Sequence, residues 1–272
     1  MTQGASARHN PIASDNGNLT QSNRFLDQVA IVVGGAHGIG KAIGARLAHE
    51  GAHVVIADID EAALESTASE ITNTRGRIET CVCDATQQVD INKVVSRAIH
   101  AFGQIDILMY IAGICIPAPF IETDEALWDS TLNVNLKGAF LAARAVVPHM
   151  LERRFGRLVF MSSTNSQNGE ELQAPYNASK AGIYLLAKTL ARELGRFGIT
   201  SNAVGPGFVR TRLTEPFLQN HEFMKKYETG NVIPVGRFAE PEEIAGPAAF
   251  LASSDAAYVN GVLLLVDGGL LA

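Results

Sequence analysis

The sequence predicts one α/β domain, built on a doubly wound parallel β-sheet with helices on both faces. Three observations lead to this prediction: apolar runs recur along the chain, stretches with helical periodicity separate them, and no linker rich in Pro or Ser interrupts the chain after residue 25. Strands that are apolar throughout are typical of a parallel sheet that is covered on both faces. Right-handed crossovers between such strands then give the doubly wound arrangement.

The expected strands are strand-like runs, most of them apolar, at residues 29–33, 53–57, 78–83, 105–111, 157–161, 199–204 and 262–266. Apolar residues recur at helical spacing in residues 40–50, 61–71, 89–102, 127–153, 175–196 and 241–252. We therefore expect residues 25–272 to form a single domain. Residues 1–24 are rich in Ser, Asn, Gln, Thr and Gly, and we expect them to be a flexible leader.

The composition allows a sizeable core and argues against several classes of function. Hydrophobic residues make up 47% and charged residues 18% of the 272 residues. The net charge of −6 gives no general attraction to nucleic-acid phosphates. No run approaches the ~18 apolar residues of a membrane-spanning helix, and residues 1–24 lack the apolar segment of a signal peptide. We expect a cytoplasmic protein that binds neither nucleic acid nor membrane.

The cysteines and histidines give no sign of a metal site. Cys81, Cys83 and Cys115 have the spacing of neither a redox Cys-x-x-Cys pair nor a zinc knuckle, and small buried thiols in a reducing cytoplasm are the simpler interpretation. The seven histidines are scattered, with no His-x-x-x-His spacing. We predict no catalytic metal.

A glycine-rich turn connects the first expected strand to the first expected helix. Gly34, Gly35, Gly38 and Gly40 would allow a tight turn whose backbone N–H groups approach a pyrophosphate closely. Such turns are common in α/β proteins, but here the strand and the helix that it requires are both present. The turn therefore predicts a dinucleotide site.

Asp58 closes the second expected strand, where a carboxylate can accept hydrogen bonds from the adenosine ribose and repel a 2′-phosphate. Its neighbour Ile59 offers no positive charge, and His37 is the only residue of the turn that could meet that phosphate. We therefore favour NAD over NADP as the cofactor.

Tyr176 and Lys180 lie four residues apart in an expected helix and should share one face. A nearby ammonium favours the phenolate, so Lys180 should lower the pKa of Tyr176 from its ordinary value of roughly 10. Tyr176 could then exchange a proton with a substrate oxygen. Tyr-x-x-x-Lys pairs are also common on solvated helices, so the pair alone does not establish a site.

Further motifs follow in order along the chain. They are Cys83-Asp84-Ala85-Thr86, Asn133-Val134-Asn135-Leu136-Lys137-Gly138, Met161-Ser162-Ser163, Asn202-Ala203-Val204-Gly205-Pro206-Gly207, Tyr258-Val259-Asn260-Gly261 and Val266-Asp267-Gly268-Gly269. With the glycine turn and the Tyr176/Lys180 pair, they make the chain resemble the short-chain dehydrogenase/reductase family, in its NAD-dependent subgroup of roughly 250 residues, from about Leu26 to the C-terminus. The resemblance implies a Rossmann-type sheet.

The resemblance also implies catalytic roles. Tyr176 matches the family's general acid/base, and Lys180 matches the lysine that lowers the pKa of that tyrosine and holds the nicotinamide ribose. Ser163 matches the serine that binds the substrate oxygen. Asn135 matches the asparagine that positions a proton-relaying water.

For the cofactor, the resemblance places Asp84 at the adenine edge, Ala112 and Gly113 beside the adenosine ribose, and Val209 and Thr211 at the carboxamide. The complete expected NAD-binding set is Gly34, His37, Gly38, Ile39, Gly40, Asp58, Ile59, Asp84, Ala85, Ala112, Gly113, Tyr176, Lys180, Pro206, Gly207, Val209 and Thr211.

Two departures from the family pattern stand out. Val33 replaces the usual threonine at the start of the glycine turn, and Tyr110-Ile111 replaces two asparagines. Those asparagines mostly brace the central sheet, so we expect the departures to affect local strand packing more than chemistry.

The expected activity is hydride transfer between NAD and a secondary alcohol or ketone. A polar segment (Asn165, Gln167, Asn168, Glu170, Glu171, Gln173) could bind a sugar, a polyol or a cyclic alcohol, or simply face solvent. Apolar residues of an expected substrate lid at residues 208–230 (Phe208, Phe217, Leu218, Phe223, Met224) could enclose an apolar substrate, or only pack the lid onto the body.

Two alternatives remain open: an NADPH-dependent carbonyl reductase acting on 3-oxoacyl thioesters, and a protein that binds NAD without chemistry.

The family resemblance implies a homotetramer.

Overall fold

The computed structural model describes residues 23–71, 74, 76–219, 221, 225, 227 and 232–272. Most of the expected leader and part of the expected lid, including Phe223 and Met224, lie outside the described residues. Within the described residues, no helix is long and apolar enough to cross a membrane.

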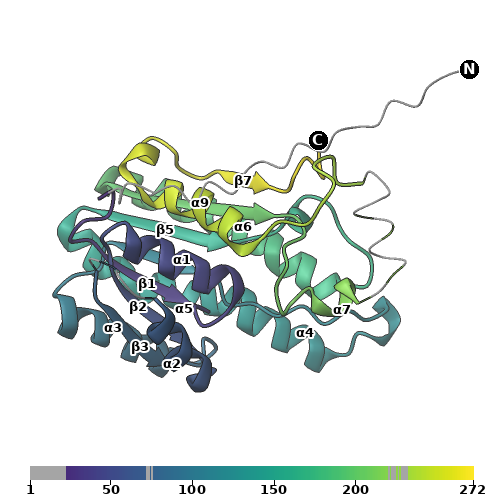
Figure 1. The fold of residues 1–272 in the computed structure, drawn as a ribbon, viewed down its shortest axis with the longest axis horizontal. Helices are drawn as coiled ribbons and strands as arrows, with labels where there is room; N and C mark the ends of the chain where they lie inside the picture. Colours follow the sequence, from purple (N-terminus) through teal and green to yellow (C-terminus); the bar gives the residue numbers. More distant parts are fainter. Residues whose placement is uncertain are drawn as a thin grey trace, which may run out of the picture.

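A parallel sheet with strand order β3-β2-β1-β4-β5-β6-β7 forms the centre of the described structure (Figure 1). Its strands are β1 (Val29–Val33), β2 (His53–Asp58), β3 (Ile78–Val82), β4 (Ile107–Tyr110), β5 (Gly156–Met161), β6 (Ile199–Pro206) and β7 (Leu263–Val266). All of them pair in parallel. The doubly wound sheet predicted from the sequence is confirmed, and each strand lies within two residues of its predicted position.

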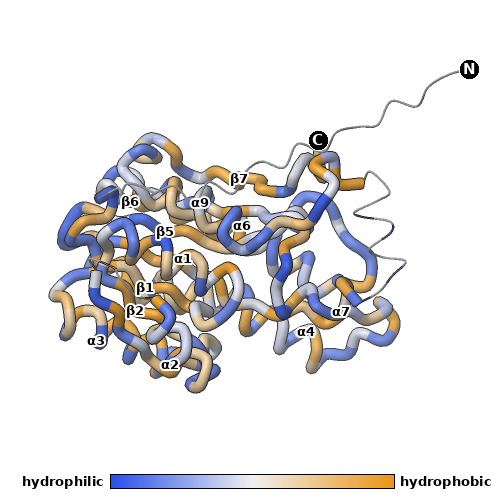
Figure 2. The backbone as a smooth tube through the Cα atoms, viewed as in Figure 1, coloured by the Kyte–Doolittle hydropathy of each residue, from blue (hydrophilic) through white to orange (hydrophobic). Residues whose placement is uncertain are grey.

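Helices cover both faces of the sheet. They are α1 (Gly38–His49), α2 (Glu61–Glu70), α3 (Gln88–Phe102), α4 (Glu125–Leu132), α5 (Gly138–Arg153), α6 (Ala174–Leu194), the short α7 (Glu215–Leu218) and α9 (Pro241–Ala252). Helices α1 and α9 pack side by side (Figure 1). Figure 2 shows that the strands between the helices are largely apolar.

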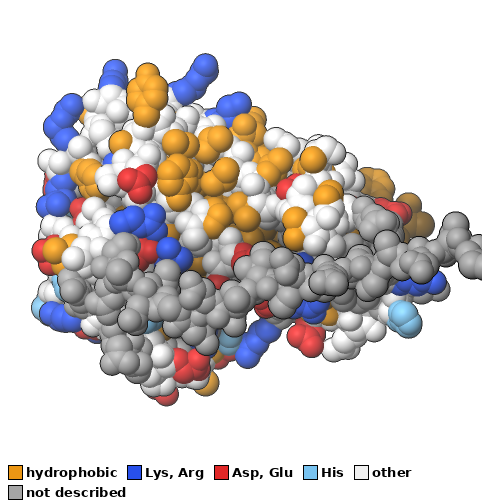
Figure 3. Space-filling view, turned by 45° about the horizontal axis from the view of Figure 1, so that its top comes forward, with side chains coloured by type: hydrophobic (Ala, Val, Ile, Leu, Met, Phe, Trp, Pro, Cys, Tyr) orange, Lys and Arg blue, Asp and Glu red, His pale blue; other side chains and the backbone are white. Residues whose placement is uncertain are grey.

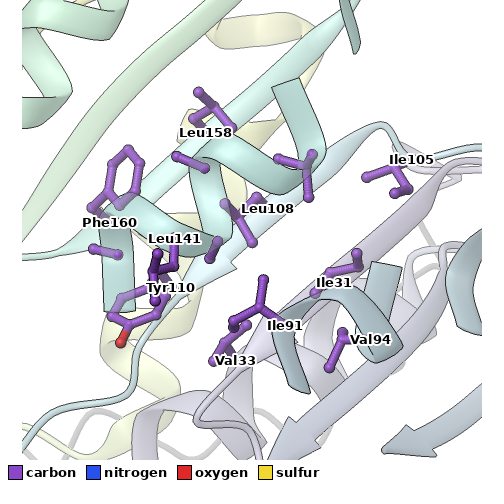
Figure 4. Packing of buried hydrophobic residues seen from close by; sticks show 14 of the residues in the cluster. Ile31, Val33, Ile91, Val94, Ile105, Leu108, Tyr110, Leu141, Leu158 and Phe160 are labelled. Atoms are coloured by element: carbon purple, nitrogen blue, oxygen red, sulfur yellow. The ribbon is translucent and has the colours of Figure 1, made fainter. Parts of the chain in front are cut away.

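Two hydrophobic cores, one on each face, hold the layers together. Successive side chains of a strand point to opposite faces, so Ile31 and Val33 of β1 join one core while Ala30 and Val32 join the other. The first core contains the inward faces of α3, α5 and α6, and the second contains those of α1, α2 and α9. Figure 4 shows part of the first core.

In the structure, the predicted helix at residues 127–153 is divided into two α-helices. Between α4 and α5, residues Asn133–Lys137 form a π-helical turn. A π-turn inserts an extra residue into the helix and is frequent at functional sites. Helical periodicity alone did not predict it.

The strand order reverses between β1 and β4, which are direct neighbours. In open α/β sheets, ligands bind beyond the carboxyl ends of the strands at such a point. The glycine turn follows β1, Ser163 follows β5, and Gly207 follows β6, so the sheet brings these distant segments to one edge.

Candidate active site

The glycine turn is built for close backbone approach. Gly34 has a φ of +82°, and a Cβ added there would lie 2.4 Å from the backbone nitrogen of Ala112. A Cβ on Gly40 would lie 1.9 Å from the carbonyl oxygen of Gly34. Side chains at either position would therefore force the turn apart. Helix α1 begins at Gly38, so its N-terminal partial positive charge lies beside the turn.

Asp58 lies at the carboxyl end of β2, where its carboxylate is already oriented. Its Oδ2 accepts a hydrogen bond from the backbone nitrogen of Ala36 at 3.0 Å, and its Oδ1 accepts one from that of Asp60 at 3.2 Å. These two hydrogen bonds fix the orientation of the Asp58 carboxylate beside the glycine turn.

Tyr176 and Lys180 lie in the first turns of α6, on one face as predicted. Lys180 Nζ is 5.4 Å from the centroid of the Tyr176 ring and donates a hydrogen bond to the carbonyl oxygen of Met161 at 2.8 Å. This bond ties Lys180 to the end of β5. Ser163, just beyond that strand, is hydrogen-bonded to the phenol of Tyr176.

The pKa shifts of this pair differ from the sequence-based expectation. Burial raises the pKa of Tyr176 above its ordinary value, a nearby Cys115 thiolate would raise it further, and the hydrogen bond with Ser163 acts in the opposite direction. Burial lowers the pKa of Lys180 to about 8, with Cys115 acting in the opposite direction. The net shift of the Tyr176 pKa is therefore upward, opposite to the predicted direction, because burial outweighs any stabilisation of the phenolate.

The physical reason is that loss of solvent disfavours the charged form of both groups. The sequence indicates that Tyr176 and Lys180 are neighbours, but it does not show that Lys180 is buried and that Tyr176 is partly shielded from solvent. The phenol of Tyr176 therefore carries its proton at neutral pH.

Asn135 lies within the π-turn and is fully buried. Its side chain accepts a hydrogen bond from the backbone nitrogen of Ile114 at 2.8 Å, and it donates to the Ile114 carbonyl at 3.0 Å and to Ser179 Oγ at 2.9 Å. Asn135 thus connects the loop after β4 to α6. Its expected part in a proton relay stays a prediction.

Tyr110, one of the two departures from the family pattern, supports the same turn. Its side chain is fully buried in the first core near Leu141 and Phe160 (Figure 4), and its hydroxyl donates to the carbonyl oxygen of Val134 at 2.5 Å. A Cβ at Gly138 would lie 2.0 Å from that hydroxyl, so the small residue there makes room for it. The expected disturbance of strand packing is absent, because β4 is buried throughout and pairs with both neighbours.

A cleft of about 610 Å³ runs along the carboxyl edge of the sheet. Every residue of the expected NAD-binding set lines it, from the glycine turn and Asp58 to Lys180 and Thr211. A second cavity of about 320 Å³ adjoins the cleft and shares Ser163 and Tyr176 with it. Asn135, by contrast, is not part of the wall of either space.

Known proteins match nearly the whole chain. A family model described as enoyl-(acyl carrier protein) reductase matches residues 34–271. The 3-oxoacyl-[acyl-carrier-protein] reductase of Thermotoga maritima is 40% identical over 248 residues, covering 91% of this chain and 99% of the relative. The L-rhamnose 1-dehydrogenase (NAD(P)(+)) of Azotobacter vinelandii is 37% identical over 251 residues, covering 90% and 97%. The solved structure of levodione reductase has a TM-score of 0.86 and 33% identity, covering 90% and 98%.

The chain belongs to the short-chain dehydrogenase/reductase family. The resemblance stated from the sequence motifs is confirmed. As a short-chain dehydrogenase/reductase, the protein is an oxidoreductase that acts on CH–OH groups, and its family uses a nicotinamide dinucleotide.

The residues that line the cleft fit such a dinucleotide. The glycine turn leaves backbone N–H groups beside a helix N-terminus, which suits a pyrophosphate. Lys180 has three N–H donors, and its bond to Met161 uses one of them. Within the described residues, no group of three or more His, Cys, Asp or Glu side chains is arranged to hold a metal ion.

Sequence analysis missed two residues that line the second cavity of this short-chain dehydrogenase/reductase site, Cys115 and Tyr227. No local sequence signal marks either residue, because each reaches the site through tertiary packing. Arg212, which the sequence offered only as a possible binder of an anionic substrate or a solvent-facing arginine, lines the cleft. Its Nη1 lies 2.7 Å from Nε2 of His37 and 3.5 Å from Oδ2 of Asp60.

Proposed function

We propose that the protein is an NAD-dependent dehydrogenase that interconverts a secondary alcohol and the corresponding ketone. The observation that carries this proposal is the meeting of Ser163, Tyr176 and Lys180 where the dinucleotide cleft joins the second cavity. A substrate in that cavity would place its oxygen beside two hydroxyl groups and its carbon toward the cleft.

The roles follow from this geometry. Ser163 donates a hydrogen bond to the substrate oxygen and orients it. Tyr176, protonated because burial raises its pKa, donates its proton to the carbonyl oxygen in reduction and regains it in oxidation. Lys180, when charged, stabilises the phenolate that forms in between. Asn135 keeps the loop and the helix around these groups in register. The bound dinucleotide supplies the hydride donor in reduction and the acceptor in oxidation.

The carboxylate of Asp58 supports NAD as the cofactor, since it would bind ribose hydroxyls and repel a 2′-phosphate. A second candidate, an NADP-dependent reductase, is favoured by one observation. Arg212 lies beside His37 at the wall of the cleft, where its guanidinium offers a positive charge that the local sequence around Asp58 lacks.

Replacing Asp58 by asparagine tests this choice. The variant keeps one of the two oxygen acceptors for the backbone and loses the negative charge. We expect kcat/KM with NADP, relative to NAD, to rise roughly 100-fold, because charge-assisted hydrogen bonds contribute ~1.5–3 kcal/mol and the repulsion of the phosphate disappears. Steady-state kinetics with both dinucleotides measure the ratio. Asp129→Asn, an exposed change on α4, is the matched control. An unchanged ratio would contradict the role of Asp58.

The polar and apolar lining of the second cavity supports a sugar, a polyol or a cyclic alcohol as substrate. The direct test is reduction of NAD by the purified protein, followed by absorbance, over sugars, polyols, alicyclic alcohols and hydroxysteroids, with NADP in parallel. Oxidation of NADPH with a 3-oxoacyl thioester tests the second candidate. Turnover with NAD on an alcohol supports the proposal. Stoichiometric NAD binding with no turnover on any substrate would favour the non-catalytic alternative.

We also propose that the protein is a homotetramer. Two separate apolar surfaces support this: Phe140 and Leu185 are exposed on α5 and α6, and Leu264, Leu265 and Val266 are partly exposed on the edge strand β7. Figure 3 shows apolar side chains gathered on the side of the molecule where β7 lies. Two different self-complementary contacts generate a tetramer. Light scattering after gel filtration should give four times the chain mass, and a monomer mass would overturn this proposal.

The cytoplasmic location stays a prediction.

A further inference from the structure

The wall of the second cavity carries a chain of side-chain amides whose orientations depend on one another. The chain starts at a backbone carbonyl, that of Glu170, which accepts a hydrogen bond from Asn177 Nδ2 at 2.7 Å. A carbonyl can only accept, so the nitrogen of Asn177 must face it. The oxygen of Asn177 therefore faces Asn165 and accepts from its Nδ2 at 2.8 Å.

Asn165 passes this orientation on to Gln173. Its Nδ2 donates a second bond, at 2.9 Å, to Gln173 Oε1, so both of its amide protons are used. On the other side, the backbone nitrogen of Asn165 donates to Ser163 Oγ at 3.1 Å, and Asn165 Oδ1 accepts from Ser163 at 3.4 Å. Gln173 must therefore turn its oxygen to Asn165, which leaves its amide N–H groups available to the cavity that it lines.

Glu170 provides a complementary group on the same wall. Its Oε1 accepts a hydrogen bond from the hydroxyl of Tyr227 at 3.0 Å, and Tyr227 is buried with its ring 4.6 Å from that of Phe208. Among the described residues, Tyr227 is the only group that hydrogen-bonds this carboxylate, so its acceptor capacity is not exhausted. Glu170 lines the same cavity as Gln173, Ser163 and Tyr176.

We infer that Glu170 and Gln173 form a subsite for a second hydroxyl group of the substrate, which makes a neutral polyhydroxylated compound the preferred substrate class. A hydroxyl is both donor and acceptor, so it can donate to the carboxylate while accepting from the amide. A substrate carboxylate at this place would meet the negative charge of Glu170. A purely apolar acyl chain would leave both polar groups without partners, which is costly in a closed site.

This inference rests on the proposed function, because the first hydroxyl must be the one that reacts at Ser163 and Tyr176. It goes further by naming the residues that select the substrate. It also separates two roles within the polar segment: Asn165 orients its neighbours, whereas Glu170 and Gln173 contact the substrate.

The experiment compares kcat/KM with NAD for threitol, L-rhamnose and cyclohexane-1,2-diol against cyclohexanol, gluconate and a 3-hydroxyacyl thioester. We expect the wild type to prefer at least one neutral polyhydroxyl probe over cyclohexanol and gluconate by at least about 10-fold, since a site with polar groups rejects analogues that lack the hydroxyl. Glu170→Gln keeps the acceptor for Tyr227 but removes the charge. Gln173→Glu keeps the acceptor for Asn165 but removes the donor. Each should reduce this preference about 10-fold.

Glu171→Gln is the matched control, since Glu171 is exposed, adjacent to Glu170 and not part of the cavity wall. It should leave the preference unchanged. A wild type that prefers cyclohexanol, gluconate or the thioester would overturn the inference, and so would a preference that survives both substitutions. In either case, turnover that depends on Tyr176 would leave the proposed function intact. Absence of turnover on every probe, with dinucleotide binding preserved, would instead contradict the proposed function itself.

Discussion

Tyr176→Phe is expected to lower kcat by about 10³-fold while changing dinucleotide affinity by no more than a few-fold. The phenyl ring keeps the packing at the start of α6 but lacks the oxygen that exchanges a proton with the substrate. General acid–base catalysis by one positioned side chain typically contributes 10²- to 10⁴-fold. Steady-state kinetics in both directions measure the loss, and titration with NADH monitors binding separately.

The same helix provides a matched control for Tyr176. Tyr184 and Lys188 repeat the spacing of Tyr176 and Lys180 two turns later, and Lys188 Nζ lies 5.1 Å from the Tyr184 ring centroid. This second pair lines neither the cleft nor the second cavity. Tyr184→Phe should therefore retain activity within about two-fold. If Tyr176→Phe retained as much, the assignment of the general acid/base would be wrong.

Lys180→Met is expected to lower kcat by about 10²-fold and to change the pH dependence of oxidation. Oxidation requires the phenolate, and burial raises the pKa of Tyr176, so the rate of oxidation should rise with pH and the rate of reduction should fall. Without the ammonium, the phenolate forms less readily. The rise in the oxidation rate should therefore move to higher pH in the variant.

The pKa of Lys180 itself predicts the pH range in which wild type and variant should differ. Because burial lowers it to about 8, Lys180 carries its charge below that pH and loses it above. The wild type and Lys180→Met should therefore differ most below pH 8 and converge above it. Lys188→Met, on the exposed side of α6, should reproduce the wild-type profile. Identical profiles for wild type and Lys180→Met would show that Lys180 acts only in binding.

The amino-acid sequence was enough to predict the architecture and the positions of the main motifs. Apolar runs predicted most of the strands, because a parallel sheet buries both faces of its inner strands. The glycine turn and Asp58 were predictable because they are local: each is defined by a strand end and by residues next to it. The expected NAD-binding set follows this rule, since almost all of its members stand at or just beyond the carboxyl ends of strands.

Spacing alone does not distinguish the two Tyr-x-x-x-Lys pairs of α6; the family resemblance pointed to Tyr176/Lys180, and the tertiary structure supplies the physical reason. Tyr176/Lys180 and Tyr184/Lys188 have the same spacing on the same helix, but only the first pair meets Ser163 at the cleft. Burial also reversed the predicted pKa shift of Tyr176, because the loss of solvent depends on everything that surrounds the phenol.

Contacts between segments far apart in the chain could not be predicted from the sequence either. Arg212 reaches His37 across 175 positions, and Tyr227 reaches Glu170 across 57. Tyr110, which looked like a defect in the family pattern, supports the π-turn that holds Asn135. Periodicity and motif spacing report only on neighbours along the chain, whereas these contacts depend on how the loops pack over the edge of the sheet.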